Sequence, residues 1–212
     1  MVLSGVAGLG VLLRGWVLGL AIAAPVGPIG VLCIRQTLAQ GWRVGLVTGL
    51  GAATADGFYG CVAALGLSAI SEFLMDYQQV LQLVGGLFLI YLGGATFRRS
   101  PAQEAATAGE TQLWKAYTTT LGLTLTNPAT ILAFTAIFAG LGLGSETAAS
   151  EGAVVLVCGI FLGSASWWLV LSSLTSGLRH RLTGDRLLWV NRLSGVVITA
   201  FGIVALSQLR LS

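Results

Sequence analysis

Residues 18–31 read LGLAIAAPVGPIGV, and this stretch places two prolines and two glycines within six positions of a long apolar run. Proline removes a backbone donor and clashes with the preceding helical turn, and glycine loosens the backbone further. We therefore expect the helix to be interrupted between Pro25 and Gly30. Within a membrane such a break is tolerated only where the freed N–H and C=O groups face protein or a polar cavity. Pro25, Gly27, Pro28 and Gly30 are thus candidate site residues.

The composition indicates an integral membrane protein. The chain has 212 residues, of which 55% are hydrophobic and 9% are charged, and its mean hydropathy is +0.87. A membrane-spanning helix needs roughly 20 apolar residues. We predict an all-α, polytopic protein with a single transmembrane domain over residues 1–212 and six spans, at 11–34, 43–70, 79–97, 116–142, 152–175 and 189–208.

The basic residues predict the orientation in the membrane. The connections between spans one and two, three and four, and five and six hold nine of the 11 Lys and Arg residues: Arg35, Arg43, Arg98, Arg99, Lys115, Arg179, Arg181, Arg186 and Arg192. The charged residues of the alternate connections are all acidic. By the positive-inside rule the three basic connections are cytoplasmic, and both termini lie outside the cytoplasm. Topology thus explains the net charge of +3, and no basic amphipathic patch points to nucleic acid.

The two halves of the chain match each other in order. Residues 18–25, 50–56 and 86–93 match 121–128, 162–168 and 195–202. Each half has three expected spans, an odd number, so the second half must be inverted in the membrane. We predict repeat one at 11–97, a cytoplasmic linker at 98–115 and repeat two at 116–208, with spans one and four both broken at proline. Inverted repeats are common in secondary transporters, whose binding site lies near the midplane between the repeats.

Asp56 is the only ionisable residue deep inside an expected span. A carboxylate there costs about 2.5–3.5 kcal/mol, and such a residue normally faces a cavity on an ion or proton path. Tyr59 lies on the same helix face and is a further candidate. The alternative for Asp56 is a structural hydrogen bond to a helix break.

The second expected break contains Thr126, Asn127 and Pro128. The Asn127 amide offers two donors and an acceptor, so it could bind a carboxylate or an ammonium group, or satisfy backbone freed by Pro128. Hydroxyls such as that of Thr126 could assist, although threonine in a helix often bonds its own backbone. Two neighbouring tryptophans, Trp167 and Trp168, either wall the pocket or pack against lipid.

Several function classes find no motif. There is no phosphate-binding Walker loop, no His, Cys and carboxylate cluster with metal-ligand spacing, and no Ser-His-Asp set within the spans. We therefore expect no cofactor, no metal site and no enzymatic activity. An intramembrane thiol oxidoreductase would need two of the scattered cysteines, Cys33, Cys61 and Cys158, to meet.

The ordered set Ala24–Pro28, Gly41–Gly45, Ala55-Asp56 with Tyr59, and Asn127-Pro128 resembles the lysine-exporter (LysE) and homoserine/threonine-exporter (RhtB) family. The resemblance implies a small six-span exporter, often a homodimer, which moves amino acids out of bacterial cells across the inner membrane and is driven by the proton-motive force. Many members read Pro-Gly-Pro, whereas Val26 precedes Gly27 here and the first proline is displaced by one residue.

These observations lead to one main hypothesis. The protein is a secondary-active exporter of amino acids, either lysine and arginine or small neutral zwitterions, coupled to protons by alternating access. A half-helix N-terminus would bind the substrate carboxylate, and Asp56 or half-helix carbonyls the ammonium group. The alternative is an exporter of inorganic cations or metals, although a hard cation prefers several oxygen ligands and only one buried carboxylate is expected.

Overall fold

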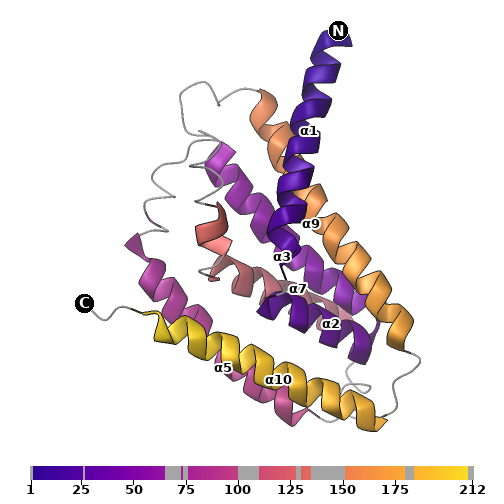
Figure 1. The fold of residues 1–212 in the computed structure, drawn as a ribbon, viewed down its shortest axis with the longest axis vertical. Coiled ribbons are helices and arrows are strands. Elements are labelled where there is room, and N and C mark those ends of the chain that lie inside the picture. Colours follow the sequence, from indigo (N-terminus) through magenta and orange to yellow (C-terminus); the bar gives the residue numbers. More distant parts are fainter. Residues whose placement is uncertain are drawn as a thin grey trace.

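Helices form every regular element that the structure describes. The computed structural model describes residues 2–25, 27–64, 73, 76–99, 110–127, 130–134, 151–179 and 184–209. Its helices are α1 (Val2–Ala23), α2 (Pro28–Gln40), α3 (Trp42–Ala64), α5 (Gln78–Arg98), α7 (Glu110–Leu125), α9 (Glu151–Leu178) and α10 (Gly184–Ser207) (Figure 1). A short helical segment follows α7 at 130–134. The prediction of an all-α membrane protein is confirmed.

Several of these helices are long and apolar enough to cross a membrane. Within the described residues, three qualify singly, at Gln78–Arg98, Gly152–Leu178 and Asp185–Ser207. A fourth candidate is the pair Gly8–Ala23 and Pro28–Gln40, which bends by 83°. The chain is therefore a multi-pass membrane protein. The six-span repeat stays a prediction, because much of the second half of expected span four lies outside the described residues.

The first helix break lies inside the stretch that the sequence singled out. Helix α1 ends at Ala23, and α2 begins at Pro28 after an extended Gly27. Proline suits this first helical position because its missing N–H would find no helical acceptor there. In the second half, α7 ends at Leu125, and the Asn127 carbonyl accepts from the N–H groups of Thr130 and Ile131, which restart the helix. Pro128 itself lies outside the described residues.

The connection between the first two expected spans is shorter than predicted. We expected residues 35–42 to form a cytoplasmic loop, but α2 continues to Gln40 and only Gly41 separates it from α3. Gly41 has φ +102°, a conformation open to glycine and rare for other residues. Arg35 therefore lies within α2 and is only 2% exposed, so its expected place in the connection between the first two spans was wrong.

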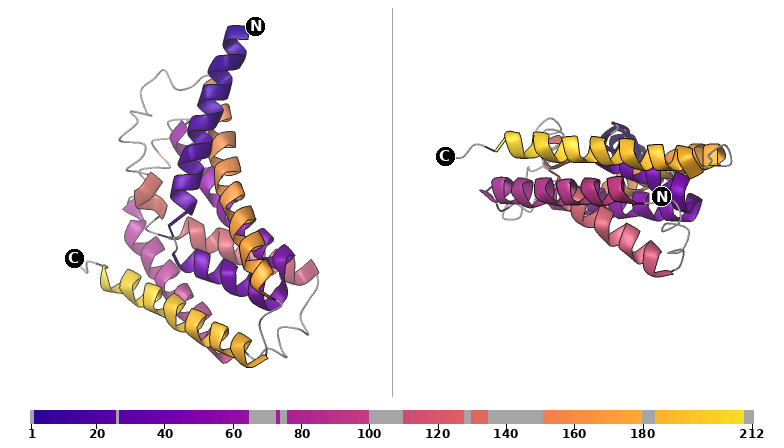
Figure 2. Two further views of the ribbon diagram at one scale, coloured as in Figure 1. Left: turned by 45° about the vertical axis from the view of Figure 1, so that its right-hand side comes forward. Right: turned by 90° about the horizontal axis from the view of Figure 1, so that it is seen from below.

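Glycines set the closest helix contacts. In the antiparallel pair α5 and α10, Gly86 lies opposite Gly202, and Gly93 lies opposite Gly195. A Cβ added to Gly93 would stand 2.8 Å from the Gly195 carbonyl oxygen, and one added to Gly195 would stand 2.7 Å from the Gly93 oxygen. Small residues allow this close backbone approach. Figure 2 shows α10 running alongside α5, and α1 alongside α9.

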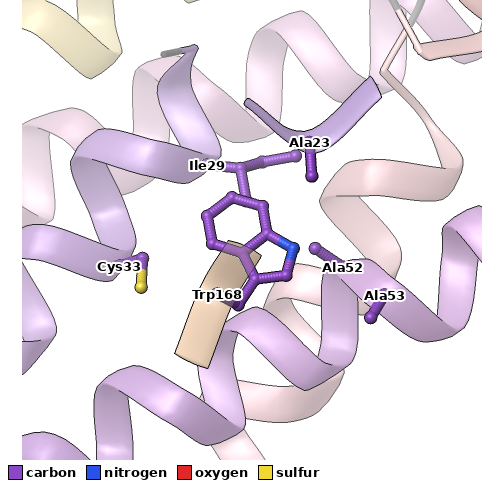
Figure 3. Close-up of a cluster of buried hydrophobic side chains, with 6 residues drawn as sticks. All are labelled: Ala23, Ile29, Cys33, Ala52, Ala53 and Trp168. Atoms are coloured by element: carbon purple, nitrogen blue, oxygen red, sulfur yellow. The ribbon is translucent and has the colours of Figure 1, made fainter. Parts of the chain in front are cut away.

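Helix α3 lies at the centre and packs against both α7 and α9. Where it faces the α1–α2 break, a buried cluster joins Ala23, Ile29, Cys33, Ala52, Ala53 and Trp168 (Figure 3). The break between α1 and α2 therefore packs against α3 and α9. These two helices contain the segments 50–56 and 162–168, which the sequence matched as repeat partners.

Candidate functional site

A small cavity of about 70 Å³ lies at the α1–α2 break. Helices α3, α7 and α9 complete its walls. Six of the predicted site residues line it: Pro25, Gly27, Pro28, Gly30, Asp56 and Asn127. Residues far apart in the sequence are thus brought to one place, with both broken segments contributing.

Asp56 lies on α3 and is 3% exposed. Its Oδ2 atom accepts a hydrogen bond from Ser164 Oγ of α9 at 2.6 Å. Ser164 is itself fully buried, and its Oγ accepts from Trp168 Nε1 at 3.1 Å. This chain of bonds fixes one carboxylate oxygen against α9. Hydrogen bonds to a charged group contribute about 1.5–3 kcal/mol, so an ionised Asp56 is firmly held.

The N-terminus of α2 bounds the same cavity. Its cap residue, Gly27, provides no side-chain hydrogen bond to the first turn. Ile29 and Gly30 follow and line the cavity, and the N–H groups of a first helical turn have no intrahelical acceptor. The partial positive charge of a helix N-terminus favours anions. The cavity is therefore lined by a carboxylate on α3, which attracts cations, and by the N-terminus of α2, which attracts anions.

Tyr59 and Thr126 do not line this cavity. The Tyr59 hydroxyl donates to the Leu125 carbonyl at 2.6 Å, which ties α3 to the last residue of α7. Thr126 Oγ1 donates to the Gly122 carbonyl at 2.9 Å, and Thr124 Oγ1 donates to the Thr120 carbonyl at 2.8 Å. Both threonines thus bond their own helix, which was the alternative that the sequence left open.

The structure also separates the two tryptophans. Trp168 is 4% exposed and lines the cavity, and Figure 3 shows its indole beside Ile29 and Ala52. Trp167 is only partly buried and packs against the outside of the same cluster. Trp168 is therefore the one of the pair that walls the site.

Sequence reasoning missed Ser164. A serine within an apolar helix is common, and its partner on another helix cannot be read from spacing. One signal was present, because the match of 50–56 with 162–168 pairs Ala52 with Ser164 and Asp56 with Trp168. In each pair one half of the chain carries a side chain of different chemistry from the other: a serine in place of alanine, and a tryptophan in place of aspartate.

A second, larger cavity of about 430 Å³ adjoins the first. The two share wall residues at the breaks, among them Pro25, Pro28 and Asn127. Its remaining walls come from α5, α7, α10 and the segment 130–134, and Thr126 lies here. Most of the surface that lines it is apolar.

Metal-binding groups do not gather in the part of the chain that the structure describes. It contains no set of three or more His, Cys, Asp and Glu residues placed to hold a metal ion. The buried thiol of Cys33 contacts the Gly45 carbonyl at 3.4 Å and Ser172 Oγ at 3.5 Å, so it lies in a helix contact.

A multi-pass helical bundle with a polar cavity at broken helices is the architecture of a membrane transporter. Comparison with known proteins agrees, since residues 20–209 match the family described as LysE type translocator. The chain belongs to this family, which confirms the resemblance found in the sequence.

Relatives occur in several bacteria, among them Bacillus subtilis and Escherichia coli. YcgF of Bacillus subtilis (strain 168), a protein assigned to amino acid efflux, is 29% identical over 191 residues, which cover 88% of this chain and 90% of YcgF. A protein of Escherichia coli (strain K12) named as a threonine efflux protein is 28% identical over 149 residues, covering 67% of this chain and 71% of its own. The uncharacterised E. coli membrane protein YahN is 29% identical over 174 residues, covering 80% and 77%. No solved structure matches the chain.

Proposed function

We propose that the protein is a secondary-active exporter that moves amino acids out of the cell across the bacterial inner membrane, coupled to protons by alternating access. The observation that carries this proposal is that Asp56 and the N-terminus of α2 line the same small cavity. Family membership and the names of two relatives, which concern amino acid and threonine efflux, support it.

The cavity matches the two charges that all amino acids share. The N–H groups of the first turn of α2, at Ile29 and Gly30, would bind the substrate carboxylate. The Asp56 carboxylate would bind the ammonium group. Ser164 occupies Oδ2, which leaves the other oxygen of the carboxylate for the substrate. Asn127, which lines the same cavity, would contact either group.

Coupling follows from competition at Asp56. One carboxylate oxygen cannot bind both a proton and the substrate ammonium group. A proton that arrives from outside would displace the ammonium group and release the substrate outward. Loss of that proton to the cytoplasm would restore the anion and reset the site. The 83° bend between α1 and α2 is the place where the two access states would differ.

The proposed orientation rests on the positive-inside rule, which places the basic connections in the cytoplasm. Gln112 Nε2, near the start of α7, donates to Gln40 Oε1 at the end of α2. Asn191 Nδ2 of α10 donates to the Arg99 carbonyl after α5. These contacts join helix ends that border the basic connections, and we propose that this side of the bundle faces the cytoplasm, with both termini outside. We also propose that the protein forms a homodimer, as the family resemblance implies.

Transport by Asp56→Asn in proteoliposomes tests the coupling. Wild-type protein is expected to move amino acid against its gradient when a pH gradient is imposed. Asp56→Asn is expected to lose at least nine-tenths of this proton-driven transport. Asp185→Asn is the matched control, since Asp185 is exposed in the first turn of α10. Proton-driven export by Asp56→Asn at the wild-type rate would overturn the proposal.

A further inference from the structure

The volumes of the two adjoining cavities indicate which part of the substrate each one can hold. The cavity at Asp56 measures about 70 Å³, whereas ligand pockets commonly occupy about 300–1,000 Å³. It has room for the charged groups of an amino acid and too little for a whole one. The adjoining cavity of about 430 Å³ falls within the range of ligand pockets.

The cavities meet at the helix breaks. Pro25, Gly27 and Pro28 line both on one side, and Asn127 and Thr130 line both on the other. A substrate whose carboxylate and ammonium group lie between α2 and Asp56 would therefore have its Cα at these shared walls. Its side chain would extend into the larger cavity, toward α5 and α10.

The larger cavity is suited to hydrocarbon. Leu89 of α5, Leu123 of α7 and Phe201 of α10 line it. The hydroxyl of Thr126 is already bonded to the Gly122 carbonyl. Among the described residues that line this cavity there is no Asp or Glu. Among these described residues the ammonium group of a lysine side chain would find no carboxylate, and a buried charge without a partner is strongly disfavoured.

We propose that the transported amino acid has an apolar side chain of about the size of leucine or methionine, which is held in the cavity between α5, α7 and α10. This inference rests on the proposed function and narrows it, because it excludes lysine, arginine and threonine as preferred substrates. Each additional buried CH₂ is expected to improve affinity about fourfold.

Competition in proteoliposomes tests this inference. The full-length protein takes up labelled leucine by counterflow while unlabelled leucine, methionine, alanine, threonine or lysine competes. Leucine and methionine are expected to compete at concentrations at least tenfold lower than threonine or lysine. Preference for threonine or lysine would overturn the inference and leave the exporter in place. Each of the five amino acids is also tested in labelled form, and failure of all five to be transported would overturn the exporter as well.

Two variants with opposite effects locate the side-chain site. Ala133→Leu adds bulk to the wall of the larger cavity and is expected to weaken competition by leucine at least tenfold, with little change for alanine. Phe201→Ala enlarges the same cavity and is expected to shift preference toward phenylalanine. Ala200→Leu is the matched control, because Ala200 is exposed on α10 and does not line the cavity. Equal selectivity in the wild type and in both cavity variants would overturn the assignment.

Discussion

Ser164 Oγ of α9 donates a 2.6 Å hydrogen bond to Asp56 Oδ2 of α3. The same hydroxyl accepts a hydrogen bond from Trp168 Nε1, so a single serine connects the acid of one half to the indole of the other. In the sequence match between the halves, Asp56 pairs with Trp168, and Ala52 pairs with Ser164. The site is therefore built at equivalent positions that carry different chemistry, which gives it one charged side and one aromatic side.

Ser164→Ala removes the donor to Asp56 and the acceptor for Trp168. The variant leaves a buried indole N–H unsatisfied, which costs about 1–3 kcal/mol. We expect a lower thermal midpoint in detergent and a higher KM for transport. Ser166→Ala is the control, since that serine bonds Trp16 in an exposed position and should change the unfolding free energy by less than about 0.5 kcal/mol. Equal stability of the two variants would contradict the role given to Ser164.

Tyr59→Phe separates packing from substrate contact. Its hydroxyl bonds the Leu125 carbonyl and does not reach the small cavity, so the loss is one hydrogen bond. We expect destabilisation of about 0.5–1.5 kcal/mol and an unchanged KM. Thermal unfolding and transport kinetics measure the two quantities on the same preparation. A tenfold rise in KM with wild-type stability would place Tyr59 at the substrate instead.

Gly93→Ala and Gly94→Ala form a matched pair on α5. A Cβ at Gly93 would clash with Thr199 Oγ1 and would stand 2.7 Å from the Thr199 backbone N of α10, whereas a Cβ at Gly94 meets nothing within 4 Å. Overpacking typically costs about 1–3 kcal/mol, so Gly93→Ala should destabilise the protein. Gly94→Ala should be neutral or stabilising by about 0.5–1 kcal/mol, because alanine favours helix. Differential scanning calorimetry of both variants measures these stabilities. The reverse order of stability would contradict the observed α5–α10 contact.

Gly41→Ala tests the corner between α2 and α3. The positive φ of Gly41 is strained for alanine, and the added Cβ would stand 2.9 Å from an Arg179 guanidinium nitrogen. We expect destabilisation of about 1 kcal/mol or more. Gly177→Ala, in α9 with nothing within 4 Å of its Cβ, is the control and should lose no stability. Wild-type stability of Gly41→Ala would mean that the corner has another conformation.

Local chemistry made the first break and the acid predictable. Proline and glycine restrict or loosen the backbone wherever they occur, so the interruption between Pro25 and Gly30 was accessible from the sequence. A carboxylate in an apolar span carries a cost that calls for a partner or a cavity, which pointed to Asp56. These inferences needed no knowledge of neighbouring helices.

Several side chains have roles that depend on tertiary contacts and could not be predicted from the sequence. Arg35 looked like a loop residue because charge normally marks the end of a span, yet the tight corner at Gly41 lets α2 continue and bury it. The roles of Trp168 and Tyr59 depended on which neighbour each side chain meets across a helix interface. Ser164 gave only one signal, its difference from Ala52 in the match between the halves, and that signal did not identify Asp56 as its partner. The larger cavity required the positions of α5 and α10, which periodicity alone does not provide.

We propose that one cavity binds both charged groups of an amino acid. Equilibrium binding of leucine, leucinamide and 4-methylpentanoic acid to the purified protein tests it most directly, because the amide lacks the carboxylate and the acid lacks the ammonium group. We predict that each analogue binds the wild type at least tenfold more weakly than leucine. Asp56→Asn should bind leucine and 4-methylpentanoic acid alike. Equal binding of leucine and 4-methylpentanoic acid by the wild type would contradict the account.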